Sequence, residues 1–172
     1  VFNSFLKDLK KNKIPLLDSY EKNYEFAFSK ATIKKFSKYK NIIIIGMGGS
    51  ILGTKSIYSF LEKKIKKKLY FFDNLDLNLN YNKIKNLKNS CVIVAGKSGK
   101  TIETIINLGS IFSKKLLKNK LIIIAEPTNN ALMTLAKKYS AETIEHKEFI
   151  SGRYSVLSET GMFPAALMGL NL

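Results

Sequence analysis

The sequence contains few features of a secreted or membrane protein. Among its 172 residues there is one cysteine, Cys91, so a disulfide-stabilised scaffold is excluded. The apolar neighbours of Cys91 in SCVIVA favour a buried hydrophobic residue over a reactive thiol. No apolar run is long enough to cross a membrane, and the first residues lack the basic, apolar, small-residue order of a secretory signal. We therefore expect a cytoplasmic protein with no membrane partner.

Acidic residues and arginine are scarce as well. The 13 Asp and Glu residues face 29 Lys and Arg residues, which gives a net charge of +16, and a single one of the 29 is arginine, Arg153. An excess of this size is typical of nucleic-acid-binding proteins. The lysines, however, are spread over several predicted helix faces, as in LEKKIKKK. We interpret them as a solvated surface and expect no nucleic-acid partner.

Short β-branched runs alternate with helical patterns along the chain. The predicted strands are residues 40–46, 68–73, 91–96, 121–126 and a shorter one at 141–146. The predicted helices are residues 20–36, 51–64, 81–88, 100–116, 129–139 and 159–170. The strands are apolar on both faces, as in a parallel sheet covered on both sides. The pattern predicts one α/β domain, a doubly wound parallel sheet of about five strands with helices on both faces.

The first strand ends in the glycine-rich turn of IIIIGMGGSILG, residues 42–53. Gly46, Gly48 and Gly49 permit positive φ angles and a close approach of the backbone, and Ser50 can cap the helix that follows. In such a sheet, ligands bind where strands lead into helix N-termini. We expect an anion here, most simply a phosphate; the alternative is a strained turn without a ligand.

Two nucleotide-binding motifs match this chain only in part. The dinucleotide fingerprint needs a small residue where Ile51 stands, although Asp73, at the end of the second strand, occupies the place of a ribose-binding acid. The segment VAGKSGKT, residues 94–101, ends like a triphosphate-binding loop, but Val94 replaces its opening glycine. We therefore do not expect ATP binding.

Two further loops carry groups that bind anions. Lys97, Ser98, Lys100 and Thr101 place cations and hydroxyls at the start of a predicted helix. In ISGRYSVLSETG, residues 150–161, a glycine turn precedes Arg153. Arginine offers a planar, permanently charged fork that lysine lacks, so this residue is suited to a delocalised oxyanion.

Three motifs, GMGGSILG, GKSGKTIET and SGRYSVLSETGMFPAAL, follow one another between about residues 40 and 170. Together they resemble the N-terminal sugar isomerase (SIS) domain of the phosphoglucose isomerase (glucose-6-phosphate isomerase) family. The resemblance implies a SIS-like three-layer sandwich. It also implies reversible isomerisation of glucose 6-phosphate to fructose 6-phosphate through a cis-enediolate, in glycolysis and gluconeogenesis, by a homodimer that needs no metal or organic cofactor.

The resemblance also implies roles for single residues. Arg153 matches the arginine that stabilises the enediolate, and Gly48 and Glu103 match supporting positions. The positions that match substrate-binding residues are Gly49, Ser50, Gly96, Lys97, Ser98, Gly99, Lys100, Thr101 and Gly152. The chain departs from the family pattern at Gly96, where serine is usual, at Lys100, where threonine is usual, and at Ser151, where glycine is usual. We expect phosphate binding to survive with an altered affinity.

We divide the chain into an N-terminal helical segment, residues 1–38, and a SIS-type sugar-phosphate-binding domain, residues 39–172. The chain starts with Val1 and stops within an apolar helical pattern, so we expect it to be part of a longer protein. The family's glutamate base, histidine and lysine lie in a second half, and the one histidine here, His146, matches none of them. We expect the isolated chain to bind sugar phosphate weakly without isomerising it. The alternative is a complete, non-catalytic sugar-phosphate sensor.

Overall fold

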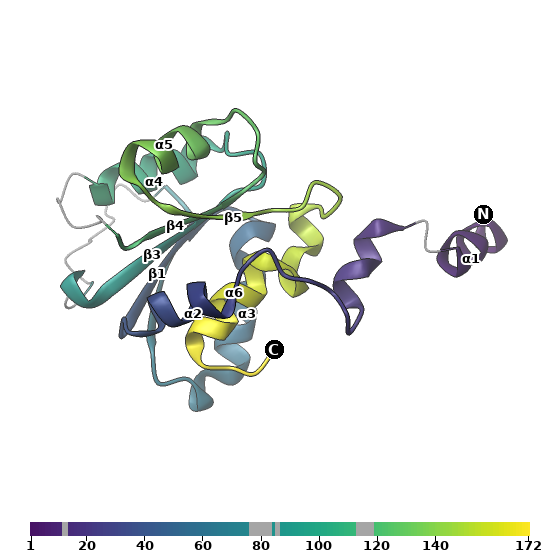
Figure 1. Cartoon of the computed structure of the whole chain (residues 1–172), viewed down its shortest axis with the longest axis horizontal. Helices are drawn as coiled ribbons and strands as arrows, with labels where there is room; N and C mark the ends of the chain where they lie inside the picture. Colours follow the sequence, from purple (N-terminus) through teal and green to yellow (C-terminus); the bar gives the residue numbers. More distant parts are fainter. Residues whose placement is uncertain (12–13, 76–83, 85–86, 113–118) are drawn as a thin grey trace.

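Five parallel strands form a single sheet in the computed structural model, which describes residues 1–11, 14–75, 84, 87–112 and 119–172. The strands are β1 (Asn41–Gly46), β2 (Lys68–Phe72), β3 (Ser90–Ala95), β4 (Leu121–Ala125) and β5 (Glu142–Glu145). Their order across the sheet is β2-β1-β3-β4-β5 (Figure 1). The predicted parallel sheet is confirmed.

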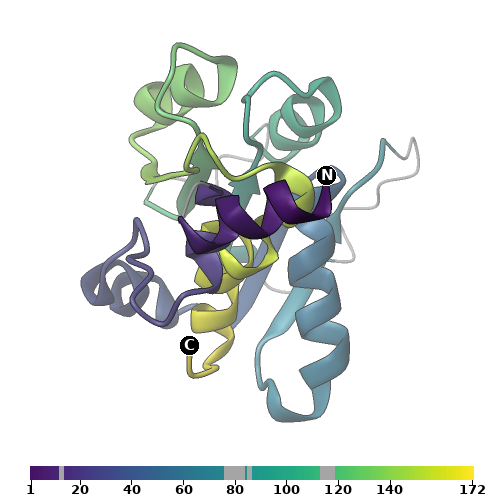
Figure 2. The same ribbon diagram turned by 90° about the vertical axis from the view of Figure 1, so that its right-hand side faces the viewer.

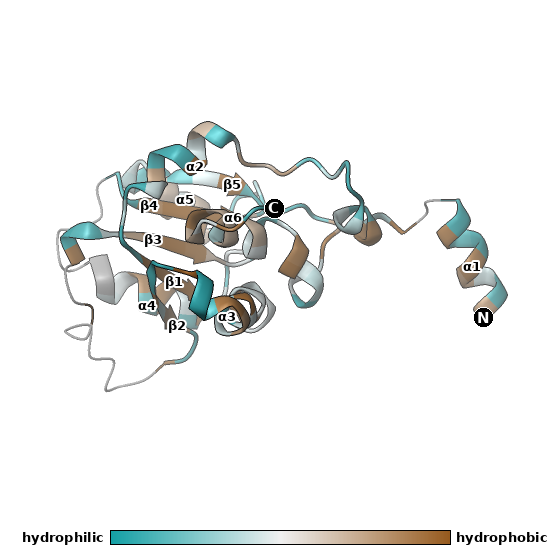
Figure 3. Ribbon diagram, turned by 90° about the horizontal axis from the view of Figure 1, so that it is seen from below, coloured by the Kyte–Doolittle hydropathy of each residue, from teal (hydrophilic) through white to brown (hydrophobic). Residues whose placement is uncertain are grey.

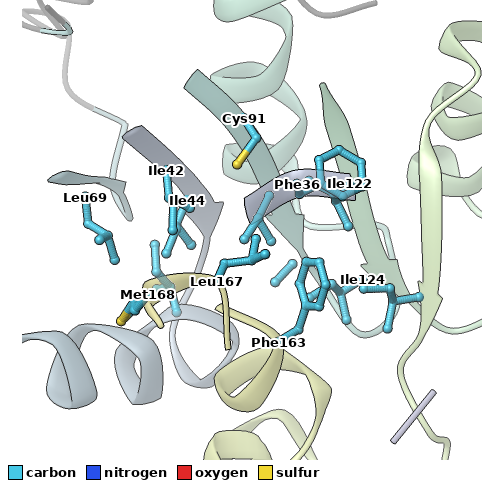
Figure 4. Packing of buried hydrophobic residues seen from close by; sticks show 14 residues of the cluster. Phe36, Ile42, Ile44, Leu69, Cys91, Ile122, Ile124, Phe163, Leu167 and Met168 are labelled. Carbon is cyan, nitrogen blue, oxygen red and sulfur yellow. The ribbon is translucent and has the colours of Figure 1, made fainter. Parts of the chain in front are cut away.

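Helices cover both faces of this sheet because each strand is apolar on both sides. Ile42 and Ile44 point into one core cluster, and Ile43 and Ile45 point into the other. The first cluster lies under α2 (Lys30–Ser37), α3 (Gly49–Leu61) and α6 (Glu159–Met168) (Figure 4). The second lies under α4 (Ile102–Phe112) and α5 (Ala131–Tyr139). Figure 3 shows β1, β3 and β4 as apolar ribbons, and Figure 1 shows the sheet between the two helical layers, which confirms the three-layer α/β arrangement.

Burial of the strand residues is the main source of stability in this sheet. The four consecutive isoleucines of β1 are at most 1% exposed. Full burial of one such side chain stabilises a fold by about 1.5–3 kcal/mol. Cys91 on β3 belongs to the same core, is 0% exposed, and its burial raises the pKa of the thiol to about 12. Cys91 is therefore a core residue, as predicted, and is protonated at neutral pH.

The N-terminal segment extends away from the body of the molecule. It contains α1 (Phe2–Lys10) and a 3₁₀ helix, η1 (Pro15–Tyr20), and η1 contacts another 3₁₀ helix, η5 (Gly152–Leu157). Figure 2 shows α1 nearest the viewer, in front of the rest of the chain. No helix in the described part of the chain is long and apolar enough to cross a membrane.

The helix predicted over residues 20–36 is wrong in its first half, because α2 begins only at Lys30. In the non-helical stretch before it, aromatic residues alternate at Tyr24, Phe26 and Phe28 and pack in sequence. Phe28 then contacts Phe163 of α6, with ring centroids 5.2 Å apart. A period of two suits an extended segment, in which every second side chain faces the same way.

Two other short 3₁₀ helices complete the described structure, η2 (Glu62–Lys64) and η4 (Leu87–Asn89). The helix predicted over residues 81–88 falls mostly outside the described residues, and so does the end of the helix predicted over residues 100–116. The predicted helices at residues 51–64, 129–139 and 159–170 correspond to α3 with η2, α5 and α6.

Candidate functional site

The candidate site lies at the carboxyl edge of the sheet, between β1 and β3. These two strands are neighbours, and Gly46 at the end of β1 is in register with Ala95 at the end of β3. The chain leaves β1 into α3 on one face of the sheet and leaves β3 into α4 on the other face. Such a switch in direction opens a crevice in which ligands of α/β proteins bind. The two predicted phosphate-binding loops therefore begin side by side.

The first loop, residues 46–50, turns sharply at Gly48. This residue has φ +55° and ψ −128°, a conformation that glycine adopts without strain, and the helix begins at the next residue. Ser50 therefore lies inside the first turn of α3 and does not cap it, and the predicted capping role is wrong. Its side chain is nearly buried, 8% exposed.

The third predicted loop, residues 150–161, contains Arg153 and packs directly against the first loop. The sequence alone does not indicate this contact. A Cβ atom added to Gly49 would lie 2.1 Å from the Gly152 carbonyl oxygen and 2.6 Å from the Arg153 nitrogen. The Ser155 hydroxyl donates to the Gly152 carbonyl oxygen at 2.8 Å and approaches the Gly49 carbonyl oxygen at 3.5 Å. Gly49 thus serves close packing between two loops, and this packing fixes where Arg153 starts.

Ser155 is in turn held from α6. It is 0% exposed, and the Thr160 hydroxyl approaches both its carbonyl oxygen and its hydroxyl oxygen at 2.8 Å. A second contact, from the Thr54 hydroxyl on α3 to the Thr160 carbonyl oxygen at 2.8 Å, ties α6 to α3. Ser155 was not among the predicted site residues, although its place two residues after the arginine in GRYS is a signal in the sequence.

The second loop, residues 96–101, also turns at a glycine with positive φ, Gly99 at +64°. The Gly99 amide donates to the Gly96 carbonyl oxygen at 3.1 Å. Ser98 at the tip of the loop is exposed, and its hydroxyl oxygen accepts a long hydrogen bond, 3.4 Å, from the Lys100 amide. Thr101 precedes α4, and Glu103 lies in the first turn of that helix.

The two lysines of this loop have different surroundings. The ammonium of Lys97 donates to the Glu148 carbonyl oxygen at 2.6 Å and lies 3.5 Å from the Glu126 carboxylate. The prediction that the Lys97 side chain supplies a cation to the ligand is therefore unsupported, because that side chain is tied to the loops after β4 and β5. Lys100 is exposed, and in the described part of the chain no carboxylate pairs with it.

Arg153 is exposed at the start of η5, and the described residues include no carboxylate paired with it. Together with Lys100 and the N-terminus of α3, it makes the edge electropositive, which suits an anionic ligand. No described residue accepts a hydrogen bond from the guanidinium, whose planar fork suits a delocalised oxyanion.

The partial nucleotide-binding matches lose support from the structure. The Asp73 carboxylate, at the end of β2, forms an ion pair with Lys55 of α3 at 2.5 Å. The ion pair gives one carboxylate oxygen of Asp73, Oδ2, a partner within the fold. Val94 lies inside β3 and is 0% exposed, so no glycine turn exists where a triphosphate-binding loop would begin.

His146 lies just after β5 and is buried, 1% exposed. Its Nδ1 lies 3.2 Å from the Lys147 carbonyl oxygen, and its Nε2 has no hydrogen-bond partner among the described residues. Burial lowers the pKa of this imidazole, so the neutral form prevails at pH 7. A buried, neutral ring fits the interpretation of His146 as a strand-end residue. Among the described residues, no group of three or more His, Cys, Asp or Glu side chains could hold a metal ion.

The family model "Phosphoglucose isomerase" matches residues 22–171. The chain belongs to the phosphoglucose isomerase family. The glucose-6-phosphate isomerase of Methanocaldococcus jannaschii is 33% identical over 145 residues, which cover 81% of this chain and 35% of that protein. The chain thus spans about a third of the length of the curated members of the phosphoglucose isomerase family that it matches.

Solved structures share the fold. A glucose-6-phosphate isomerase from Chlamydia trachomatis superposes with a TM-score of 0.65 at 22% identity, covering 85% of this chain and 32% of that one. A protein of Escherichia coli CFT073 gives a TM-score of 0.64 at 18% identity, covering 97% of this chain and 92% of that one. The three-layer fold of this phosphoglucose isomerase family member therefore also occurs in a chain of similar size.

Proposed function

We propose that this chain forms the sugar-phosphate-binding part of a glucose-6-phosphate isomerase, a cytoplasmic, homodimeric enzyme of glycolysis and gluconeogenesis. The reaction is the reversible conversion of glucose 6-phosphate to fructose 6-phosphate through a cis-enediolate, without a metal or organic cofactor. Membership of the phosphoglucose isomerase family supports this proposal, as do curated relatives named glucose-6-phosphate isomerase.

One observation carries the proposal: the backbone contact between Gly49 and Gly152 places the loop that contains Arg153 beside the crevice between β1 and β3. In our proposal, the Ser98 and Thr101 hydroxyls and the Lys100 ammonium hold the phosphate. Backbone help is expected from Lys97, Gly99 and Lys100, but the Gly99 amide already donates to the Gly96 carbonyl oxygen, so it falls to the Lys97 and Lys100 amides. Each hydrogen bond to a charged group contributes roughly 1.5–3 kcal/mol, so a few suffice for millimolar to micromolar binding. The turn at Gly48, Gly49 and Ser50 then faces the sugar.

Arg153 has the catalytic role in this proposal. When a proton leaves the carbon beside the carbonyl, negative charge moves onto the two oxygens of the enediolate. A guanidinium fork can donate to both oxygens at once and needs no rearrangement at that moment. Glu103, in the first turn of α4, has a supporting role only.

Proton transfer between the two carbons is assigned to groups outside this chain. His146 is buried and neutral, and the Glu126 carboxylate pairs with Lys97. By its resemblance to the family, the full protein carries a glutamate base, a ring-opening histidine and a lysine in its second half. We therefore propose that the isolated chain binds sugar phosphate weakly and does not isomerise it; measurable turnover by the purified chain would contradict this.

The decisive experiment is to determine the coding region on both sides of these residues and to assay the complete product for fructose 6-phosphate formed from glucose 6-phosphate. Loss of one donor to a developing oxyanion typically lowers kcat about 10²–10³-fold, and Arg153→Ala should reduce kcat by at least that factor. Arg153→Lys is the matched control, because it keeps the charge and loses the fork. Unchanged kcat in Arg153→Ala would refute the assigned role.

A second candidate function is a stand-alone sugar-phosphate sensor. The Escherichia coli CFT073 protein supports it, because the present chain covers 92% of that chain and so matches nearly all of a protein of this size. A reading frame that continues past Leu172 into a domain with the family's glutamate, histidine and lysine would exclude the sensor. A stop codon at that point, with binding but no turnover, would favour it.

A further inference from the structure

The shape of the second loop is set from outside the loop, by the segment that connects β4 to α5. The Glu126 amide donates to the Lys97 carbonyl oxygen at 3.0 Å, which joins the two segments through their backbones. Asn130 then fills the space beside Gly99. A Cβ atom added to Gly99 would lie 2.1 Å from Asn130 Oδ1 and 2.4 Å from its Cγ.

Asn130 is itself held in one orientation. It is 5% exposed, and its Oδ1 accepts a hydrogen bond from the Met133 amide at 2.9 Å, which caps α5. Its Nδ2 lies 3.0 Å from the Glu126 carbonyl oxygen and 3.2 Å from the Thr128 hydroxyl oxygen. Both ends of the carboxamide are therefore engaged, so the side chain forms a fixed wall behind Gly99.

We propose that Asn130 is a positioning residue for phosphate binding, acting through Gly99. This inference rests on the proposed function, because the loop that it shapes is the proposed phosphate loop. Gly99 stands in the left-handed region, and the carboxamide occupies the space into which the loop would otherwise relax. Holding the donors of the loop in one arrangement removes an ordering cost from ligand binding.

The first test compares Asn130→Ser with Asn129→Ser by titrating each chain with glucose 6-phosphate and with inorganic phosphate, using NMR chemical shifts. Serine is a good N-cap, so α5 should persist, but it is too short to fill the space beside Gly99. We expect Asn130→Ser to weaken both ligands about tenfold and by the same factor, because the effect acts on the phosphate group. Asn129 is exposed, and its serine variant should bind as the unsubstituted chain does.

The second test is a reciprocal rescue. Gly99→Ala alone should weaken phosphate binding, because the new methyl collides with the Asn130 carboxamide. In Gly99→Ala/Asn130→Ala the carboxamide is gone, and the Cβ of residue 130 would lie 3.1 Å from the new methyl. Binding should therefore recover in part relative to Gly99→Ala, a coupling that independent sites do not show. Asn130→Asp keeps the cap and the size but loses the two contacts of Nδ2, so it should also bind phosphate less tightly and serves as a second variant if the serine variant folds poorly.

The outcomes separate the two proposals. Affinities of a folded Asn130→Ser chain that equal those of the unsubstituted chain, or a double variant no better than Gly99→Ala, would overturn the role of Asn130 and leave the proposed function standing. An unsubstituted chain that binds neither ligand would overturn both.

Discussion

Replacement of Gly49 by alanine tests the loop contact on which the site depends. The added Cβ would lie 2.1 Å from the Gly152 carbonyl oxygen, 2.3 Å from its carbon and 2.6 Å from the Arg153 nitrogen, whereas Cβ contacts under 3.0 Å essentially never occur. All three atoms belong to the backbone, so no side chain can rotate away. The arginine loop has to move by about 1 Å, or α3 has to shift in the opposite direction.

The expected cost has two parts. Overpacking of a well-packed contact typically destabilises a protein by about 1–3 kcal/mol. For a chain of this length, 1 kcal/mol corresponds to about 2–4 °C in Tm, so Gly49→Ala should lower Tm by about 2–12 °C. A displacement of about 1 Å at a catalytic group can lower the rate about 10²-fold. In the complete enzyme, kcat should therefore fall by about that factor even at temperatures where the variant is fully folded.

Gly109→Ala is the matched control. Gly109 lies in α4, and a Cβ added there meets no atom of the described residues within 4 Å. Alanine in a helix interior is more stable than glycine by roughly 0.5–1 kcal/mol, so Tm should rise slightly and kcat should not change. The two variants are compared by thermal denaturation followed by circular dichroism and by steady-state kinetics. If Gly49→Ala matched the unsubstituted protein in both Tm and kcat, the contact between Gly49 and Gly152 would not position Arg153.

Other perturbations give distinct expected results. Ser98→Ala should weaken glucose 6-phosphate binding by at least about tenfold, the value of one hydrogen bond to a charged group, and an unchanged affinity in calorimetry would remove Ser98 from the phosphate site. Burial, followed by the Glu159 carboxylate, raises the pKa of the Tyr24 hydroxyl above its ordinary value. Because the folded state then holds this proton more tightly, the contribution of Tyr24 to stability is fully present below about pH 10 and is lost at higher pH. In Tyr24→Phe, the free energy of unfolding, measured by urea denaturation, should fall less above about pH 10 than in the unsubstituted protein. An equal fall in both proteins would contradict this contribution of Tyr24. The pKa of His146 is lowered by burial, so its contribution has the opposite sign: stability is present above about pH 6.5 and is lost as pH falls. His146→Gln should reduce the loss on acidification, and a profile unchanged between pH 7 and 5 would refute it.

The sheet could be predicted from the sequence because its signal is local. Four isoleucines in a row in β1 need cover on both faces, and that requirement alone implies helices above and below. The helix predicted over the segment before α2 was wrong, although the aromatic residues of this segment alternate with a period of two. What decides its structure is distant: Glu159, fully buried, accepts a hydrogen bond from the Tyr24 hydroxyl at 3.0 Å and one from the Ala27 amide at 3.1 Å. No local pattern near Tyr24 contains that partner.

The candidate site also has local features that the sequence predicts and distant contacts that it does not. Glycine turns are visible in a sequence, and of the three glycines in the first loop Gly48 has a positive φ angle, whereas Gly46 and Gly49 do not. The positive φ angle of Gly99 was not predicted. The partners of those turns are not visible, since Gly49 meets Gly152 and Gly99 meets Asn130 only after the strands are ordered in the sheet. The Lys97 side chain illustrates the limit, because its partner Glu126 follows another strand.

The proposed function separates phosphate binding, assigned to the carboxyl edge of the sheet, from proton transfer. A phosphate needs several fixed donors, and we propose that the loops after the neighbouring strands β1 and β3 supply them. An enediolate needs a delocalised cation, and the one arginine of the chain stands where the third loop meets the first. A base for carbon acids needs a carboxylate or imidazole whose pKa is poised near neutrality and which reaches the substrate. His146 fails the second requirement because it is buried, and Glu126 is held by Lys97. In the proposed function, this edge therefore binds the sugar phosphate and Arg153 stabilises the intermediate, whereas the proton is moved by groups outside the 172 residues; turnover by the purified chain would contradict this division.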